Sequence, residues 1–305
     1  MQADSPAQSP PAGASSDWTI DQGWRDYSAE DHRVWLTLYE RQAELLPGRA
    51  CDPFLKGLDA LDLHGRGIPD FNELNEKLRA LTGWSVVAVP GLVPDEVFFD
   101  HLANRRFPAG RFIRKPDQLD YLEEPDVFHD VFGHVPMLTD PVFADYMQAY
   151  GQGGLRAMQL GRLHNLARLY WYTVEFGLLD TPQGLRIYGA GIVSSLGESM
   201  FSLEDPSPNR LGFDLVRVMR TPYRIDDFQQ VYFVLPSLRR LLDDTLQDFA
   251  PIYAELARGS DIPIEAITPA DKAFTRGDQT YAHAGGRLAR ARTRVEVVDG
   301  GPSAV

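Results

Sequence analysis

The chain has 305 residues, of which 44% are hydrophobic and 24% are charged, as in an ordinary globular protein. Its formal net charge of −13 argues against a nucleic-acid partner, because such proteins need a basic surface. No apolar run approaches the ~18 residues that cross a bilayer. The N-terminus lacks a secretory signal, and the single cysteine, Cys51, cannot form an intramolecular disulfide. We therefore expect a cytoplasmic protein without a membrane partner.

The two ends of the chain differ in composition from the region between them. Residues 1–16 are mostly Pro, Ala, Ser and Gln, and residues 284–305 contain Gly-Gly pairs and alternating Ala and Arg. Neither segment can bury enough apolar surface to offset its ordering entropy, so we expect both to be disordered. Residues 17–283 contain no linker-like break and no internal repeat, which predicts a single domain.

Helix and strand signals follow one another along this domain. Ser28 with Asp31, and Asp70 with Glu73, are capping pairs that precede apolar residues at helical spacing. Residues 163–179 and 237–256 are long and apolar enough to be core helices. Short strands are predicted at Trp84–Val89, Arg111–Arg114, Leu185–Tyr188 and Val231–Leu235. The pattern predicts a mainly α fold with a few short β-hairpins, in the α+β class, and not a regular βαβ alternation.

The most informative segment is EPDVFHDVFGHVP, residues 124–136. Its two histidines, His129 and His134, would point about 140° apart on an unbroken α-helix. Gly133 and the following Pro136 favour a helix that ends just before His134. The second imidazole could then turn back toward the first, so that the two could bind one metal ion. The spacing differs from that of the zinc proteases, in which the histidines are four residues apart.

A third candidate ligand, Glu175, lies in the segment RLYWYTVEFG, 41 residues after His134. This run is apolar on nearly every helical face, and a buried carboxylate is costly unless it is paired or bound to a metal. Two histidines and one carboxylate form the facial triad of non-haem Fe(II) oxygenases. Spacing alone leaves other interpretations open. The histidines could be hydrogen-bonded core residues, the glutamate could pair with an arginine, and the same ligands could hold zinc.

These residues resemble the pterin-dependent aromatic amino acid hydroxylases, and the resemblance extends from about Trp18 to about Ala282. It rests on FHDVFGHVP and YWYTVEFG together with LHGRGIPDF (63–71), VPGLVP (89–94), RFIR (111–114), YGAGIVSSLGE (188–198) and DFQQVYFVLPSL (227–238). The chain is similar to the compact bacterial members, because it lacks the regulatory N-terminal region and the heptad-bearing C-terminal helix of the animal enzymes. Those bacterial members hydroxylate phenylalanine and are usually monomers.

The resemblance implies the catalytic-domain fold of this family and a monooxygenase reaction. L-Phenylalanine would be hydroxylated to L-tyrosine with O2, Fe(II) and a tetrahydropterin cosubstrate. The implied iron ligands are His129, His134 and Glu175, with Tyr170 close to the iron. The implied pterin contacts are the backbone of Gly91, Leu92 and Val93, the stacked ring of Phe98, and the neighbourhood of Asp130, which replaces a longer glutamate of the animal enzymes.

The substrate contacts implied by the resemblance begin with Arg114, whose guanidinium would clamp the substrate carboxylate. Asp126 would orient this arginine, Trp171 would form a wall against the substrate ring, and Ser194 would position the polar end of the substrate. Leu122 departs from the family pattern, because the animal enzymes carry a substrate-contacting threonine there. Pro108 likewise replaces a histidine near the pterin.

Three alternatives to phenylalanine hydroxylation remain at this point. The same chemistry could act on tryptophan or tyrosine, the three ligands could serve a zinc hydrolase, or the chain could be a metal-free protein that binds an aromatic amino acid. Metal analysis separates the second from an iron enzyme, and a chelator would leave the third unaffected.

Overall fold

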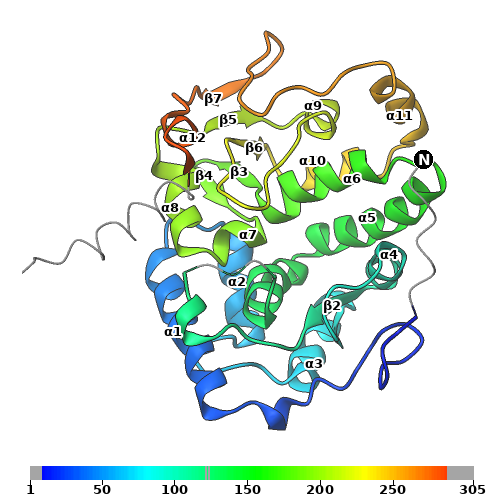
Figure 1. Cartoon of the computed structure of the whole chain (residues 1–305), viewed down its shortest axis with the longest axis vertical. Helices are drawn as coiled ribbons and strands as arrows, with labels where there is room; N and C mark the ends of the chain where they lie inside the picture. Colours follow the sequence, from blue (N-terminus) through cyan, green and yellow to red (C-terminus); the bar gives the residue numbers. More distant parts are fainter. Residues whose placement is uncertain (1–8, 121, 123, 287–305) are drawn as a thin grey trace, which may run out of the picture.

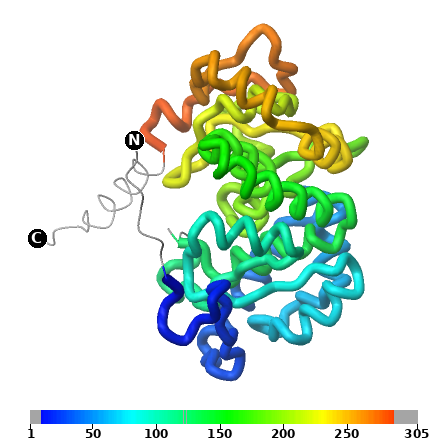
Figure 2. The backbone as a smooth tube through the Cα atoms, turned by 90° about the vertical axis from the view of Figure 1, so that its right-hand side faces the viewer, coloured from blue at the N-terminus to red at the C-terminus, as the bar shows by residue number. Residues whose placement is uncertain are grey.

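The computed structural model describes residues 9–120, 122 and 124–286 of the chain. The N-terminal part forms one end of the molecule, coloured blue and cyan, and the C-terminal part forms the other, coloured yellow and orange (Figure 1, Figure 2). The N-terminal end contains η1 (Trp24–Asp26), α1 (Ala29–Leu45), α2 (Asp52–Leu61), α3 (Phe71–Thr82), β1 (Ser85–Val89), α4 (Asp95–Ala103), β2 (Arg106–Gly110) and η2 (Pro116–Gln118). β1 and β2 pair in parallel.

The middle of the chain carries two π-helices. Its elements are η3 (Phe128–His134, π), η4 (Val135–Thr139, 3-10), α5 (Pro141–Gln159), α6 (Leu163–Tyr170) and η5 (Trp171–Glu175, π). α5 packs against α4 on one side and α10 on the other, and it lies between the two ends of the molecule (Figure 1). The candidate ligands therefore belong to segments at the centre of the fold.

The C-terminal end is built on a five-stranded sheet of order β4-β3-β6-β5-β7. Its elements are β3 (Leu178–Thr181), β4 (Gly184–Ile187), α7 (Ala190–Val193), α8 (Leu196–Glu204), β5 (Asn209–Gly212), α9 (Leu215–Met219), β6 (Val231–Leu235), α10 (Leu238–Thr245), α11 (Ala250–Leu256), β7 (Ala273–Thr275) and α12 (Thr280–His283). The predicted fold class, mainly helical α+β, is confirmed. Among the pairs of described strands, β3–β4 is a hairpin, whereas β1–β2, β3–β6 and β5–β6 are parallel.

Both N-cap residues predicted from the sequence, Ser28 and Asp70, are confirmed, but only Ser28 forms the full capping pair. Ser28 and Asp31 form a capping box at the start of α1, and the Asp70 side chain accepts the Asn72 N–H at the start of α3. The predicted strand Arg111–Arg114 is wrong, because the paired strand β2 ends before it. The register ends with Val89 opposite Gly110, and no described residue pairs as a strand with Arg111–Arg114.

Two apolar segments predicted to be single helices are each interrupted. Residues 163–179 divide into α6 and the π-helix η5, after which β3 begins. Residues 237–256 divide into α10 and α11, with Asp248 accepting the Ala250 N–H where α11 starts. The spacing of apolar residues predicts which residues are buried. The same spacing continues across the point where a helix is interrupted, so it does not show where the interruption lies.

Aromatic packing fixes one face of η3 to the N-terminal helices. Phe128 and Phe132 stack with ring centroids 4.7 Å apart, and Trp35 of α1 and Phe54 of α2 meet them edge-on. All four side chains are buried. Burial of each large apolar side chain contributes about 1.5–3 kcal/mol, and each aromatic pair adds about 0.5–1.5 kcal/mol. The histidines lie on the opposite face of η3, which does not pack against these helices.

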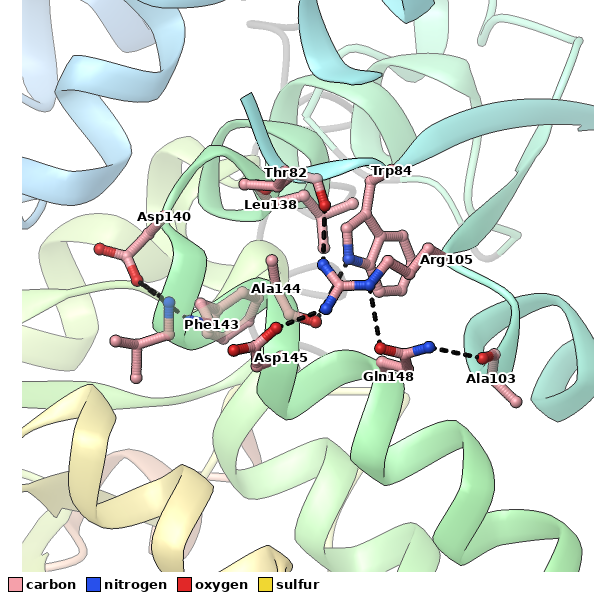
Figure 3. A network of polar contacts seen from close by, with 11 residues as sticks. Thr82, Trp84, Ala103, Arg105, Leu138, Asp140, Phe143, Ala144, Asp145 and Gln148 are labelled. Carbon is pink, nitrogen blue, oxygen red and sulfur yellow. Dashed lines mark hydrogen bonds and ion pairs between the residues drawn. The ribbon is translucent and has the colours of Figure 1, made fainter. Parts of the chain in front are cut away.

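A network of polar contacts fixes the β1–β2 sheet against α5 (Figure 3). Arg105, immediately before β2, has a φ of 54°, which is uncommon for a residue other than glycine. Its guanidinium donates to Thr82 O at the end of α3 and to Gln148 Oε1 on α5, and it pairs with Asp145. Gln148 in turn donates to Ala103 O at the end of α4. Contacts with α3, α4 and α5 thus fix Arg105, the residue immediately before β2.

The predicted disordered ends, residues 1–16 and 284–305, lie largely outside the described residues. In the described part of the first segment, Ala14 N–H donates to Pro11 O. Residues 284–286 follow directly on α12. Within the described part of the chain, no helix has the length and apolar character that crossing a membrane requires.

Candidate active site

Three side chains from two π-helices converge at the centre of the molecule. His129 and His134 come from η3, and Glu175 ends η5. His134 Nε2 lies 3.2 Å from His129 Nε2 and 3.2 Å from Glu175 Oε1, and His129 Nε2 lies 3.6 Å from Glu175 Oε2. The candidate donor atoms all lie within 4.8 Å of one another. This arrangement of nitrogen and oxygen donors fits one divalent transition-metal ion.

The prediction that the helix ends before His134 is wrong, and the reason is its winding. η3 continues through His134 as a π-helix and passes directly into η4. A π-helix bonds each N–H to the carbonyl five residues back, so His129 and His134 share one face. In η5 the Phe176 N–H donates to Trp171 O in the same five-residue pattern. Altered winding, and not a helix end, brings the ligands together.

The pKa shifts of two of the candidate ligands, His129 and Glu175, suit metal binding. Burial lowers the pKa of His129 to about 4, partly opposed by the charge of Glu175. Burial alone would raise the pKa of Glu175, but the charges of His134 and His129, with hydrogen bonds from His134 and the Gly191 N–H, hold it below its usual value. A neutral imidazole and an ionised carboxylate are the forms that bind metals.

Ser194 fixes which nitrogen of His129 faces the other ligands. Its hydroxyl donates to Ala190 O at 2.7 Å, so its oxygen is left to accept from His129 Nδ1 at 3.0 Å. The Nδ1–H tautomer leaves the Nε2 lone pair directed into the site. The sequence resemblance implied a substrate contact for Ser194. This residue does line the cavity described next, but its hydroxyl is already engaged with His129.

A cavity of about 870 Å³ opens onto the three ligands. Its size lies within the range of small-molecule sites. Its walls include all but one of the site residues expected from the sequence: Gly91, Leu92, Val93, Phe98, Arg114, His129, Asp130, His134, Tyr170, Trp171, Glu175 and Ser194. The exception, Asp126, is fully buried and contacts Arg114 from beneath.

Arg114 is held in the cavity wall by a two-point ion pair. Its Nε donates to Asp126 Oδ2 at 2.8 Å and its Nη2 to Asp126 Oδ1 at 2.9 Å, while its backbone N–H also donates to Oδ2. His129 N–H donates to Asp126 Oδ1. Burial would raise the pKa of Asp126, but the hydrogen bonds and charge of Arg114 hold it below its usual value. One carboxylate thus connects the cavity arginine to the backbone of a candidate ligand.

Aromatic rings form two further walls of the cavity. Trp171 stacks on Tyr223 with centroids 4.7 Å apart and lies against Phe176. Phe98 meets Tyr170 edge-on, and the Tyr170 ring lies nearly parallel to that of His134. Burial raises the pKa of Tyr170 well above its usual value, so its hydroxyl keeps its proton. These flat, rigid surfaces suit planar ring ligands.

Asp130 lies beside the ligands and is tied to β2. Its Oδ2 accepts the Gly110 N–H at 2.7 Å. Burial raises its pKa to about 7, partly opposed by this hydrogen bond. Leu122 and Pro108, the two departures from the animal sequences, both line the cavity. They give apolar contacts where the animal enzymes carry polar side chains.

Several cavity residues were not anticipated from the sequence. They include Leu38, Arg41 and Gln42 of α1, Glu198 of α8, and Ile225 and Asp227 of the loop before β6. Glu198 is buried and accepts from the Tyr232 hydroxyl at 2.8 Å, so the reasoning applied to Glu175 could have found it in YGAGIVSSLGE. Gln42 follows Leu38 by four residues on the buried stripe of α1, a polar residue at an apolar position.

The ligand set and the aromatic cavity in a mainly helical domain define a non-haem metal site of the oxygenase type. Residues 23–270 match the family of biopterin-dependent aromatic amino acid hydroxylases. The chain belongs to this family. Family membership favours iron over zinc, and catalysis over simple binding.

The relatives of the chain include bacterial enzymes that match most of its length. It is 71% identical over 291 residues to phenylalanine-4-hydroxylase of Caulobacter vibrioides, covering 95% of this chain and 99% of the relative. It is 59% identical over 265 residues to phenylalanine-4-hydroxylase of Chromobacterium violaceum, covering 87% and 89% of the two chains. The iron- and phenylalanine-bound crystal structure of the Chromobacterium violaceum protein has a TM-score of 0.82 at 57% identity, covering 88% and 97%.

Proposed function

We propose that this protein is a phenylalanine 4-monooxygenase, which converts L-phenylalanine and O2 to L-tyrosine with Fe(II) and a tetrahydropterin cosubstrate. The observation that carries this proposal is the cluster of His129, His134 and Glu175 in a cavity that also exposes an arginine and aromatic rings. Relatives at 71% and 59% identity are named phenylalanine-4-hydroxylase, which favours phenylalanine over tryptophan as the substrate.

His129, His134 and Glu175 hold the iron in this proposal. A triad of this kind occupies one face of the ion and leaves the other positions open. When bound, the iron and the reduced pterin supply the oxygen activation that no amino-acid side chain provides. The protein fixes the ligands in their metal-binding forms, through burial of His129 and through the Ser194 contact that sets its tautomer.

Arg114 and Trp171 bind and orient the amino acid. The guanidinium, already aligned by Asp126, presents its remaining N–H groups to the substrate carboxylate. Trp171, supported by Tyr223, gives a flat wall against which the substrate ring lies. Fixing the two ends of the substrate reduces its freedom before reaction. Leu122 adds an apolar contact and excludes water.

The pterin binds, in this proposal, to cavity residues of α4 and of the segment that precedes it. Phe98 would stack on the pterin ring, and the backbone groups of Gly91, Leu92 and Val93 would pair with its polar groups. Asp130, held by Gly110, gives a carboxylate near the same ring. Tyr170 contacts both Phe98 and the ligand His134 and retains its phenolic proton.

A product assay on the purified protein tests this proposal. Phenylalanine, tyrosine and tryptophan are each supplied with Fe(II), tetrahydropterin and O2, in parallel with a chelator-treated sample and a sample reloaded with Zn(II). We expect tyrosine from phenylalanine, loss of activity with chelator or zinc, and slower reaction of tryptophan. Faster hydroxylation of tryptophan would reassign the substrate. The absence of product from all three, with iron bound, would refute the activity.

We also infer that the enzyme acts as a cytoplasmic monomer without nucleic-acid or membrane partners. The net charge of −13 and the bacterial relatives support this inference. Size-exclusion chromatography with light scattering should give a mass near 34.2 kDa at micromolar concentration. A mass of twice that value or more would contradict the monomer.

A further inference from the structure

The short helix α7 contacts both kinds of candidate metal ligand. From its C-terminal end, Ser194 accepts from His129 Nδ1 at 3.0 Å. From its first turn, Gly191 lies against Glu175, and its backbone N–H helps to lower the pKa of that carboxylate. A Cβ added at Gly191 would stand 3.2 Å from Glu175 Oε2 and 2.9 Å from the Phe176 ring, so backbone and carboxylate are in close approach. Any displacement of α7 would therefore be transmitted to two ligands.

α7 has only four residues and cannot fix its own position. Isolated helices of this length are unstable, since nucleation costs more than a single turn returns. Its C-terminal carbonyls are held from outside by two side chains. Gln42 Nε2 of α1 donates to Val193 O, and Ser199 Oγ of α8 donates to Ile192 O at 2.8 Å. Gln42 Nε2 also lies 3.4 Å from Ser199 Oγ, which links the two supports.

Gln42 is an unusual residue for its position. It is 2% exposed and lies on the buried face of α1 with Val34, Trp35 and Leu38. Its Oε1 has no hydrogen-bond partner among the described residues. A buried amide with one unsatisfied atom is costly compared with an apolar side chain of the same volume. What the amide provides in return is one donor, directed at the carbonyl immediately before Ser194.

We propose that Gln42 is a positioning residue for the metal site: through Val193 and α7 it sets where Ser194 meets His129 and where Gly191 meets Glu175. The proposal rests on the proposed function only in taking His129, His134 and Glu175 as metal ligands. Partners that orient metal ligands from outside change metal affinity by about 10–100-fold when removed. Gln42 is separated from the ligands by one more contact than these partners are. Its removal should therefore change metal affinity by an amount at the lower end of this range.

The test measures metal binding in the absence of substrates, with Co(II) as the probe. Gln42→Met keeps the length of the side chain and removes the donor. Its Co(II) affinity, from competition with a chelator, is expected to fall about 10-fold, and the visible cobalt spectrum should change in intensity or position. Ser194→Ala gives the reference loss. In the Ser194→Ala background, Gln42→Met should have a smaller effect on affinity than in the wild type, because part of its action passes through Ser194.

Asn165→Leu is the matched control. Asn165 is also buried, donates Nδ2 to a backbone carbonyl, Met219 O, and has an unpartnered Oδ1, but it is outside the cavity wall and contacts no candidate ligand. The substitution Asn165→Leu should lower the unfolding midpoint of the metal-free protein without changing its Co(II) affinity. If Gln42→Met behaves like Asn165→Leu, with stability lowered and affinity and spectrum unchanged, Gln42 is a packing residue and the proposal is overturned.

Two further measurements keep the outcome decisive. Should Gln42→Met fail to fold, Ser199→Ala removes the second support of α7 with a smaller change and should also weaken Co(II) binding. Unchanged affinity there would overturn the role of α7. If the wild type binds Co(II) but, when loaded with Fe(II), hydroxylates none of the aromatic amino acids, the proposed activity alone is refuted. Failure of Co(II) to bind the wild type would refute the ligand set and the role of Gln42 with it.

Discussion

Substitution of Asp126 by asparagine separates the structural role of the buried ion pair from its role in substrate binding. The Asp126 carboxylate accepts four hydrogen bonds: two from Arg114 N–H groups at Oδ2, and one each from Arg114 Nη2 and His129 N–H at Oδ1. Asparagine has the same shape but replaces one oxygen by an NH2 donor. Whichever way the amide turns, two donors then face another donor.

The size of the effect follows from these contacts. Breaking a buried ion pair costs about 3–5 kcal/mol, because the remaining charge is left unpaired. This is a large part of the ~5–15 kcal/mol by which domains are stable, so Asp126→Asn should fold with a clearly lower urea midpoint. Arg114 also loses its alignment. Loss of about 1.5–3 kcal/mol of a charge-assisted contact corresponds to a rise of about 10–100-fold in the KM for phenylalanine.

The control is a second buried ion pair of the same kind. Arg217 Nε pairs with Asp271 at 3.1 Å, and both side chains are buried, but neither residue lines the cavity. Asp271→Asn should lower the urea midpoint comparably and leave both KM values unchanged. Asp126→Asn should raise the KM for phenylalanine and leave that for pterin within about twofold. If the ratio of the KM for phenylalanine to the KM for pterin is unchanged in Asp126→Asn, the ion pair of Arg114 and Asp126 has only a structural role.

Three other substitutions or treatments test different parts of the molecule. Glu175→Gln keeps the side-chain volume and removes the charge, so it should weaken iron binding and abolish hydroxylation with little change in the unfolding midpoint. Iron analysis together with the product assay checks this. A normal iron content with retained turnover would contradict the assignment of Glu175 as a ligand. His101 is buried and contacts Asp17 O through Nε2, and burial lowers its pKa. Because this pKa is lower in the folded protein, the unfolded chain binds the His101 proton at a higher pH than the folded protein does. The contribution of neutral His101 to stability is therefore fully present above the unfolded pKa of 6.5 and is lost as the pH falls below it. His101→Gln should therefore lose less stability between about pH 7 and pH 5 than the wild type, measured by urea unfolding, and identical pH dependence would exclude His101 as the cause. Cys51 is 1% exposed and burial raises its pKa to about 12, so iodoacetamide should modify it only on unfolding; rapid modification under native conditions, seen by mass spectrometry, would show that α2 opens locally.

Local signals in the sequence were sufficient where the determining contacts are themselves local. The capping box of Ser28 and Asp31 satisfies backbone groups within three residues, so its pattern is complete in the sequence. The strand β6 was also predicted at Val231–Leu235 and is found there, because a fully apolar run of that length suits a central buried strand; its partners β3 and β5, which lie elsewhere in the chain, were not predicted.

Residues whose role depends on distant partners were not found in this way. Gln42 contacts Val193, 151 positions away, and nothing near it in the sequence indicates that partner. Its place on the stripe of Val34, Trp35 and Leu38 does show that it is buried, and therefore that it needs a partner. Periodicity can thus nominate such a residue, but only the fold identifies what it contacts.

The π-winding of η3 was the largest failure of the sequence reasoning, and it reconciles two demands on one segment. Phe128 and Phe132, four residues apart, must both pack into the core, where their rings stack within 9° of parallel. His129 and His134, five residues apart, must both face the cavity, where their rings lie 5.0 Å apart. An α-helix meets the first demand and places the histidines about 140° apart. The wider π-turn meets both, at the cost of a rarely adopted backbone winding.

This cost explains why the irregular winding occurs where the ligands are. π-turns are rare and concentrate at functional sites, since they persist only where surrounding contacts compensate for them. In η3 the compensation comes from the aromatic packing of Phe128 and Phe132 on α1 and α2. In η5 it comes from Trp171, stacked on Tyr223, in the helix that ends at Glu175. The core that stabilises each π-helix therefore also sets the geometry of the metal ligands, and substitutions there should affect metal binding as well as stability.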